Sequence, residues 1–370
     1  MKKNNSLYGS TVLITGGTGS WGNQLTSQLL ANYNPKEIRI FSRGEHKQVE
    51  MKRKFKNDLI KYFIGDVRDL ERLKLVSRNV DYIFHLAALK HVHVCEDNPW
   101  EAVQTNIVGT QNIIESAIEN KVRKVVDVST DKAVDPFNLY GVTKACGEKL
   151  IIAANNISPD TSFVCIRGGN VLGTNGSVIP LFKEQISKNN EITITNSEMT
   201  RFFMKVEEAI GLVLDAATHS IGGEIMVMKM PAAKIVDLAQ TIIRRLGNKK
   251  TTMRQIGIRP GEKLYEVLVS KYETPRTYEF GKYYLILPQI HIPKTEKYYS
   301  QKNPKKIKLD EYTSINTAQL SHNAIEKLLE SDGWFTNNGE KEATKYLKSL
   351  SSVDLANFVK NENWIKRNML

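Results

Sequence analysis

A glycine-rich turn near the start of the chain constrains the fold most. Residues 11–14 (TVLI) form a short apolar run, and the glycine-rich residues 16–22 (GGTGSWG) follow it almost directly. Residues 23–33 (NQLTSQLLANY) then carry leucines at helical spacing. Such a turn between a strand and a helix lets the backbone approach a pyrophosphate, whose charge faces the helix N-terminus. Glycines that serve only a tight turn are the alternative, but the position after a first strand favours a nucleotide site.

Strand-like and helical runs alternate along the first half of the chain. The strand-like runs are 37–42 (EIRIFS), 61–67 (KYFIGDV), 80–88 (VDYIFHLAA), 122–130 (VRKVVDVST) and 162–171 (SFVCIRGGNV). Helical patterns such as residues 101–119 separate several of them. Alternation of this kind is typical of parallel βαβ units. We therefore expect an α/β fold with a doubly wound parallel sheet of the Rossmann type.

The alternation loosens after about residue 170, which predicts a division into domains. We expect residues 1–170 to form mainly a Rossmann-type domain that binds the nucleotide and residues 171–330 a smaller α/β domain for the substrate, with some interleaving. Residues 331–370 read as a polar helical extension. Helical patterns in the second half occupy residues 176–190, 207–218 and 235–247.

The composition is that of a soluble globular protein. Hydrophobic residues make up 41% and charged residues 25% of the 370 residues. No apolar run approaches the roughly 20 residues of a membrane-spanning helix. The cysteines, Cys95, Cys146 and Cys165, lack metal-ligand spacing and cannot all pair with one another. We expect a cytoplasmic protein without a metal site and without a membrane partner.

The net charge of +12 raises the question of nucleic acid as a partner. Lysine and arginine are scattered along the chain, with one denser patch at residues 293–308 (PKTEKYYSQKNPKKIK). No nucleic-acid-binding motif accompanies them. We interpret the patch as a solvated loop and expect no nucleic acid partner.

Residues 128–144 (VSTDKAVDPFNLYGVTK) hold the candidate catalytic groups. Tyr140 and Lys144 stand four residues apart, so on a helix they share one face. An ammonium beside a phenol lowers the pKa of the phenol and makes it a plausible general base toward a sugar hydroxyl. Asp131 and Lys132 end a predicted strand, where such folds place their ligands. A structural ion pair that caps the strand is the alternative for these two residues.

The end of the second predicted strand indicates which dinucleotide binds. NAD-preferring proteins usually carry an acid there for the ribose 2′-hydroxyl, whereas this chain has Ser42 and Arg43, with Lys47 close by. These residue types suit a 2′-phosphate and predict NADP. Asp66 follows the third strand, where it is placed to bond the adenine amine. A surface loop of no consequence at residues 42–47 is the alternative.

Several segments together resemble a known family. With its glycine turn and its Tyr-x-x-x-Lys pair, the chain resembles an extended short-chain dehydrogenase/reductase. Within that superfamily it resembles the UDP-N-acetylglucosamine 4,6-dehydratases, notably the C5-inverting type of the pseudaminic acid pathway, over roughly residues 8–330. The segments that carry the resemblance are SRGEHKQ (42–48), AALKHV (87–92), TNIVGTQN (105–112), STDKAVDPFNLYGVTK (129–144), MTRFFM (199–204) and RPGEKLYEVL (259–268). The family usually has proline where this chain has His93, a departure that concerns loop shape.

The resemblance implies a lyase reaction on UDP-N-acetylglucosamine. Such an enzyme uses tightly bound NADP to oxidise C4, eliminates water across C5 and C6, and returns hydride to C6. The product would be UDP-2-acetamido-2,6-dideoxy-β-L-arabino-hexos-4-ulose. By resemblance, Tyr140 takes the proton of O4, Lys132 acts at C5 and Asp131 serves the C6 oxygen, with the division between the last two left open.

The resemblance and the motifs together define the candidate site. Candidate cofactor residues are Gly16, Gly19, Ser20, Trp21, Gly22, Ser42, Arg43, Lys47, Asp66, Val67, Ala87, Ala88, Lys90, Tyr140 and Lys144. Candidate substrate residues are Lys90, Thr130, Asn170, Arg201, Arg259 and Glu262, with Arg259 expected to clamp the diphosphate and Glu262 to accept from ribose hydroxyls.

Other functions remain compatible with the same fold. A C5-retaining dehydratase or a UDP-hexose 4-epimerase would share it, although an epimerase has no obvious use for Asp131 and Lys132. A non-catalytic NADP-binding sensor would keep the glycine turn without a reason to keep the acid and base groups. Family members assemble as homo-oligomers, often hexamers, and the resemblance implies an oligomer here too.

Overall fold

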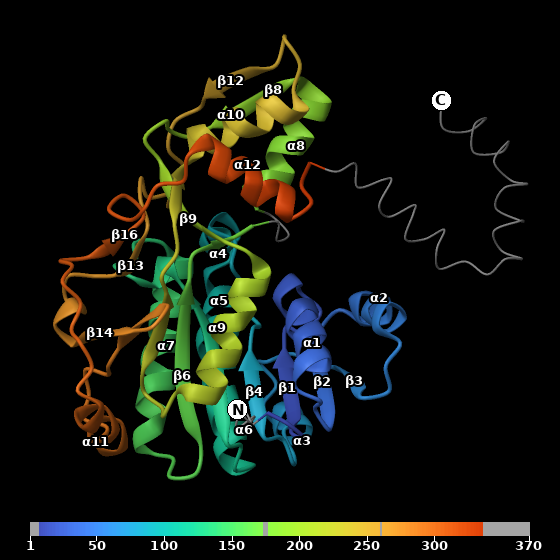
Figure 1. Ribbon diagram of the computed structural model, residues 1–370. Helices are drawn as coiled ribbons and strands as arrows, with labels where there is room; N and C mark the ends of the chain where they lie inside the picture. Colours follow the sequence, from blue (N-terminus) through green and yellow to red (C-terminus); the bar gives the residue numbers. More distant parts are fainter. Residues whose placement is uncertain (1–6, 173–176, 260, 336–370) are drawn as a thin grey trace, which may run out of the picture.

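The computed structural model describes residues 7–172, 177–259 and 261–335, and its largest feature is a nine-stranded sheet (Figure 1). The strands of this sheet are β1 (Thr11–Thr15), β2 (Glu37–Ser42), β3 (Ile60–Ile64), β4 (Tyr82–His85), β5 (Lys124–Thr130), β6 (Ser162–Gly168), β10 (Ile225–Met228), β14 (Thr277–Phe280) and β15 (Tyr283–Ile286). They lie in the order β14-β15-β10-β6-β5-β4-β1-β2-β3. From β10 to β3 neighbouring strands are parallel, and β15 and β14 add an antiparallel edge.

The predicted fold class is confirmed. Strands β3-β2-β1-β4-β5-β6 have the order of a doubly wound Rossmann sheet. From β1 the chain adds strands first toward β3 and then, from β4 onward, on the other side of β1, so the strand order reverses between β1 and β4. Strand β2 occupies the predicted residues 37–42, whereas the predicted run 162–171 divides into β6 and the separate β7 (Asn170–Val171). The carboxyl ends of these strands form one edge of the sheet, where such folds bind ligands.

Helices cover both faces of the sheet. Helices α1 (Ser20–Asn32) and α9 (Val206–His219) pack together over one face (Figure 1). Helices α3 (Leu70–Val76), α6 (Gly109–Glu119) and α7 (Leu139–Ala153) form the layer on the other face. A short helix, α2 (Glu45–Phe55), lies beside β2 and β3, and α4 (Val92–Asp97) contacts α7.

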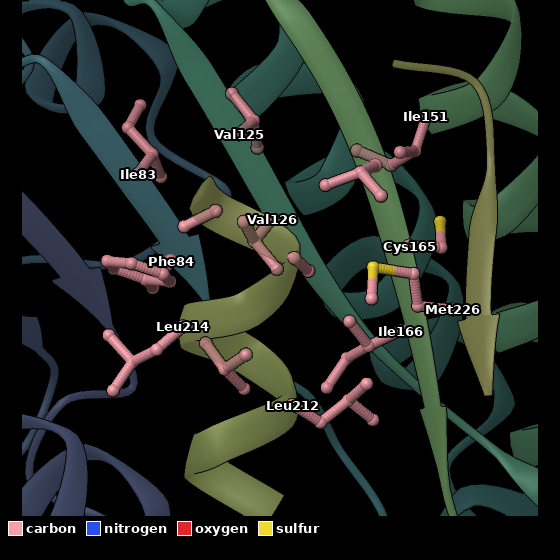
Figure 2. Packing of buried hydrophobic residues seen from close by; sticks show 14 of the residues in the cluster. Ile83, Phe84, Val125, Val126, Ile151, Cys165, Ile166, Leu212, Leu214 and Met226 are labelled. Atoms are coloured by element: carbon pink, nitrogen blue, oxygen red, sulfur yellow. The ribbon is translucent and has the colours of Figure 1, made fainter. Parts of the chain in front are cut away.

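Helix α9 shows why the second half of the chain rejoins the main sheet. Figure 2 shows its Leu212 and Leu214 packed against strands that carry Phe84, Val126 and Ile166, and all five side chains are buried. The helix predicted at residues 207–218 therefore covers the main sheet. Strands β10, β14 and β15 join the same sheet, so the two halves of the chain interleave.

Most of the remaining elements surround a second, smaller core. This core is formed by buried side chains such as Phe182, Ile192, Leu238 and Leu329. The elements around this core are α8 (Val178–Asn189), β8 (Glu191–Ile194), β9 (Thr200–Met204), β11 (Ala232–Lys234), α10 (Ile235–Leu246), β12 (Thr252–Gln255) and α12 (His322–Ser331). Two further strands, β13 (Val267–Val269) and β16 (Tyr312–Thr313), contribute Leu268, Val269 and Tyr312 to the main core instead. Together with β7, all these strands form three small sheets, β11-β9-β7, β12-β8 and β13-β16.

Three segments differ from or extend beyond the expectations. The basic patch predicted as a loop is largely a helix, α11 (Pro293–Lys302), which begins with proline at its first turn. The helix predicted at residues 101–119 is divided into α5 (Pro99–Val103), a π-helical turn (Gln104–Val108) and α6. The predicted C-terminal extension lies outside the described residues from residue 336 onward. No helix in the described ranges is long and apolar enough to cross a membrane.

Candidate active site

A cavity of about 990 Å³ opens at the carboxyl edge of the main sheet. Its walls come from the turn after β1, the ends of β2 to β6, and the segment around β7. This is the crevice where doubly wound sheets hold their ligands. The predicted site residues that line it are Gly16, Gly19, Ser20, Trp21, Gly22, Ser42, Arg43, Lys47, Asp66, Val67, Ala87, Ala88, Lys90, Thr130, Asp131, Lys132, Tyr140 and Asn170.

The glycine turn leaves no room for side chains. Gly16 adopts a φ of +64°, and a Cβ atom on it would lie 2.9 Å from the backbone of Ala87. A Cβ on Gly22 would lie 2.2 Å from the carbonyl oxygen of Gly17. Helix α1 starts at Ser20, one residue after Gly19. The turn therefore brings bare backbone and a helix N-terminus to the cavity wall, which suits a pyrophosphate.

The end of β2 forms a cationic corner of the cavity. Arg43 is more than half exposed, and its Nη1 lies 3.9 Å from Oδ2 of Asp66. Gln48, on the first turns of α2, donates from Nε2 to the hydroxyl of Ser42 at 3.1 Å and to the carbonyl of Phe63 at 2.8 Å. Gln48 thus fixes the position of Ser42. Gln48 is the last residue of the segment 42–48 that carries the resemblance, but it was not predicted as a site residue.

Asp66 is held by a neighbouring arginine. Arg68 donates to Asp66 from Nε and Nη2, at 3.0 and 2.7 Å, and to Glu101 from Nη1 at 2.6 Å. Burial would raise the pKa of Asp66, but the hydrogen bonds and charge of Arg68 outweigh burial and lower that pKa. Asp66 is therefore an oriented anion at the cavity wall, and Arg68 is a supporting residue that the motifs do not reveal.

Strand β5 ends in a cluster of polar side chains. The hydroxyl of Thr130 donates to Oδ1 of Asp131 at 2.8 Å, and Nζ of Lys132 donates to the same oxygen at 3.1 Å. Asp131 is 1% exposed. Its second oxygen, Oδ2, has no hydrogen-bond partner among the described residues. A structural ion pair that only caps the strand does not account for this unpaired oxygen, because buried polar atoms are normally satisfied.

Lys132 also contacts a carboxylate from a distant part of the chain. Its Nζ lies 3.3 Å from Oε1 of Glu266, which directly precedes β13 and is 2% exposed. Burial would lower the pKa of Lys132, but the charges of Asp131 and Glu266 outweigh burial and raise that pKa. Glu266 was not predicted as a site residue. The available signal was its place in the segment 259–268, which carries the resemblance.

Tyr140 and Lys144 share one face of α7, as predicted, but the pKa of Tyr140 is shifted in the direction opposite to the prediction. Burial raises the pKa of Tyr140, and this exceeds the lowering by Lys144, Lys132 and a hydrogen bond with the side chain of Thr130. The prediction of a net lowered pKa is therefore wrong for this structure. Nζ of Lys144 lies 3.3 Å from Oδ2 of the buried Asp127, so part of its charge is already neutralised. Lys144 is not among the described residues that line the cavity.

A row of polar side chains lies beneath the cavity. Thr15, His85 and Asp127 are in register on the neighbouring strands β1, β4 and β5. The hydroxyl of Thr15 and Nδ1 of His85 are 2.8 Å apart. Burial lowers the pKa of His85 to about 4, against the opposing charge of Asp127. His85 is thus neutral near pH 7, and Asp127 remains the counter-ion of Lys144. A charged residue inside the apolar run 122–130 was the sequence signal for Asp127.

Three predicted substrate residues do not line the described part of the cavity. Arg201 is 7% exposed, donates to the carbonyls of Thr200 and Lys263 at 2.8 Å, and lies 3.4 Å from Glu266. Arg259 is exposed, and its Nη1 lies 4.0 Å from Glu262. The predicted contacts of these residues with a nucleotide sugar stay predictions.

Comparisons with known proteins establish the family. The polysaccharide biosynthesis protein family matches residues 12–288. The chain belongs to this family. This member of the polysaccharide biosynthesis family is also 47% identical over 295 residues to the UDP-N-acetylglucosamine 4,6-dehydratase (inverting) of Campylobacter jejuni subsp. jejuni serotype O:23/36 (strain 81-176), covering 79% of this chain and 87% of that protein. The predicted resemblance is confirmed, and the predicted enzyme class, a dehydratase, is the one that this relative carries in its name.

Relatives of the polysaccharide biosynthesis family also carry another activity in their names. The chain is 45% identical over 324 residues to the UDP-glucose 4-epimerase of Rickettsia bellii (strain OSU 85-389), covering 86% of this chain and 95% of that protein. Among solved structures, that of Pen from Bacillus thuringiensis matches with a TM-score of 0.83 and 38% identity, over 90% of this chain and 100% of that one. Sequence identity alone does not separate the two activities.

Proposed function

We propose that this chain is an NADP-dependent UDP-N-acetylglucosamine 4,6-dehydratase that inverts C5. The observation that carries the proposal is the ion pair of Lys132 and Asp131 at the cavity wall, linked through Thr130 to Tyr140. This arrangement places one amine, one carboxyl group and one phenol around the same space. The inverting dehydratase of Campylobacter jejuni, at 47% identity, supports the choice of reaction.

The glycine turn and the cationic corner fit NADP. Gly16, Gly19 and the start of α1 would hold the pyrophosphate, and Ser42, Arg43 and Lys47 would hold the 2′-phosphate. When bound, the nicotinamide supplies the hydride exchange that oxidises C4 and later reduces C6. Lys90, Thr130 and Asn170 line the same cavity and would contact the sugar nucleotide.

Proton transfer by the chain's own residues accounts for the elimination. Burial favours the protonated phenol of Tyr140, so the phenol proton must first pass to solvent. The resulting phenolate accepts the proton of O4 as C4 becomes a ketone, and the ketone in turn acidifies the C5 proton. Lys132 then removes the C5 proton while Asp131 protonates the C6 hydroxyl, which leaves as water. Both groups start in the wrong protonation state, as an ammonium and a carboxylate. Transfer of one proton across their 3.1 Å hydrogen bond gives the amine and the carboxylic acid that the step requires.

The UDP-hexose 4-epimerases are the second candidate, because one of them is 45% identical to this chain. An epimerase oxidises and reduces C4 and loses no water. It needs Tyr140 but gives no task to the Asp131–Lys132 pair or to the unpaired Oδ2 of Asp131. The site therefore favours the dehydratase.

Substitution of Lys132 tests the proposal. The wild-type protein is expected to convert UDP-N-acetylglucosamine to a product one water lighter, and Lys132→Ala should abolish this loss because no amine remains to take the C5 proton. Mass spectrometry of the sugar nucleotide measures both. Lys188→Ala, which removes an exposed lysine paired with Glu184 on α8, is the control and should behave as wild type. Full turnover by Lys132→Ala contradicts the assigned role, and an isomer of unchanged mass from the wild type indicates the epimerase.

A further inference from the structure

Glu266 is a buried carboxylate beside Lys132, and the reaction described so far gives it no task. Its Oε1 lies 3.3 Å from Nζ of Lys132 and 3.4 Å from Nε of Arg201. Its Oε2 is buried without a hydrogen-bond partner among the described residues. Buried carboxylates normally satisfy both oxygens, so an unpaired one calls for an explanation.

The chain holds Glu266 in place from several directions. Its backbone N–H donates to the hydroxyl of Ser314, at 2.9 Å, and β13 begins at the next residue. The segment before it is anchored to the loop after β5, because Nζ of Lys263 donates to the carbonyl of Val134 at 2.8 Å. Asn138, the N-cap of α7, donates from Nδ2 to the carbonyl of Gly261 at 2.9 Å. The helix that carries Tyr140 and the segment that carries Glu266 are thus joined.

The charges of the cluster balance in pairs. Asp131 and Glu266 are the two anions, and Lys132 and Arg201 are the two cations. When the proton of Lys132 passes to Asp131, both members of that pair become neutral and their mutual attraction is lost. Glu266 and Arg201 keep their charges through this change. The Lys132 amine therefore has a hydrogen-bond acceptor, Oε1 of Glu266, at the moment when Asp131 turns to the substrate.

We propose that Glu266 is a positioning residue for the elimination step, which holds Nζ of Lys132 at C5 while Asp131 carries the proton for the departing hydroxyl. This inference rests on the proposed dehydratase function. The protons balance within the cluster: Lys132 gives one to Asp131, Asp131 gives it to the C6 hydroxyl, and Lys132 receives one from C5. The ammonium that forms on Lys132 is stabilised by the Glu266 carboxylate, and the resting pair is restored.

A purely structural role for Glu266, as the counter-ion of Arg201, makes a different prediction. In that case the loss of its charge would weaken the fold and slow every chemical step alike. A positioning role slows the elimination more than the oxidation at C4, because the elimination uses Lys132 directly. The oxidation uses Tyr140, which Lys132 influences only through its charge. The two steps can be separated in a single turnover, by reduced-cofactor absorbance for the first and by loss of water for the second.

Glu266→Gln is the test variant. We expect C4 oxidation within about twofold of the wild-type rate and elimination slower by at least about tenfold, a fraction of what a general acid or base contributes. Glu224→Gln is the matched control, since Glu224 is a fully buried carboxylate that accepts from Tyr299 outside the cavity lining. It should lower thermal stability without changing the ratio of the two rates. An unchanged ratio in Glu266→Gln overturns the proposal.

The pH dependence of elimination gives a second readout. The groups that face Lys132 are Asp131, Glu266, Arg201, Tyr140 and Lys263. Asp131 and Glu266 raise the pKa of Lys132, and removal of one negative charge lowers it. Above that pKa the pair has lost its shared proton and Asp131 cannot act as an acid. The alkaline decline of elimination is therefore expected at lower pH in Glu266→Gln than in the wild type, and a decline at the same pH in both proteins contradicts the proposal.

The outcomes separate this inference from the proposed function. If the wild type loses no water from UDP-N-acetylglucosamine, the proposed function fails first. If the wild type does and Glu266→Gln keeps the wild-type ratio of rates, only the inference fails. Should Glu266→Gln not fold, Glu266→Asp takes its place, since its carboxylate is withdrawn by one methylene. It should slow elimination relative to oxidation, and equal slowing of both steps overturns the proposal.

Discussion

The phenol of Tyr140 is subject to opposing influences. Burial disfavours its anion, while the ammonium groups of Lys144 and Lys132 favour it. Asp127 reduces the contribution of Lys144, because it lies 3.3 Å from the same ammonium. A Tyr-x-x-x-Lys pair is usually interpreted as evidence that the lysine lowers the pKa of the phenol, but this interpretation does not consider a counter-ion of the lysine. At the residue scale, the environment of Lys144 matters as much as its spacing from Tyr140.

Arg43 decides the cofactor prediction. Its guanidinium stands at the cavity corner beside Ser42 and would pair with a 2′-phosphate. The nucleotide released from the purified wild-type protein on denaturation, identified by mass spectrometry, should be NADP. Arg43→Ala should release at least about tenfold less NADP, because a charge-assisted contact is lost. Arg53→Ala, on the exposed side of α2, is the control and should match the wild type. NAD as the dominant nucleotide of the wild type contradicts the prediction.

Secondary-structure elements explain how the acid–base groups converge. The apolar residues Val125 and Val126 anchor β5 in the core, so its polar end emerges at the cavity. A 3₁₀ turn (Asp131–Ala133) follows at once and directs the Asp131–Lys132 pair. Helix α7 then starts after Asn138, whose side chain accepts from the N–H of Gly141 at 2.8 Å. Tyr140 therefore lies in the first turn of α7, close to the end of β5.

A buried ion cluster fastens these elements together. Arg167 on β6 donates to Glu148 on α7 at 2.7 and 2.8 Å and to Glu273 at 2.9 Å. Arg167→Ala leaves the buried Glu148 without its cation and leaves Glu273 with Arg276 alone. The substitution is expected to lower the free energy of unfolding by about 3–5 kcal/mol. Urea-induced unfolding measures this loss. Arg254→Ala removes the exposed pair with Glu191 and should leave the midpoint nearly unchanged. Equal midpoints for the two variants would show that the cluster is dispensable.

At the scale of the whole molecule, the cavity lies where two cores meet. Leu172, Ile179 and Phe203 belong to the smaller core and also line the cavity, opposite the strand ends of the main sheet. The first half of the chain thus supplies the glycine turn and the proposed acid–base groups, and the second half contributes apolar side chains to the wall of the same cavity. The predicted homo-oligomer and the cytoplasmic location stay predictions.

The sequence predicted the sheet and the cavity wall better than the contacts behind them. The glycine turn, the strand runs and the Asp131–Lys132 pair are local patterns whose positions follow from the fold class. Glu266 and Arg201 reach Lys132 from segments that are more than 60 residues distant in sequence, and only the folded chain brings them there. Gly22, in contrast, could be predicted from the sequence. It lies close to Gly17 within the same turn, and the spacing of the glycines in residues 16–22 already indicates this close approach.

One measurement tests the central claim most directly. The wild-type protein is incubated with UDP-N-acetylglucosamine in deuterium oxide, and the product is analysed by proton NMR and mass spectrometry. Inversion requires that C5 lose its proton on one face and gain a solvent-derived proton on the opposite face. The product should therefore lack one water, carry deuterium at C5 and show an inverted configuration there. A product of unchanged mass that keeps its original C5 proton would contradict the account.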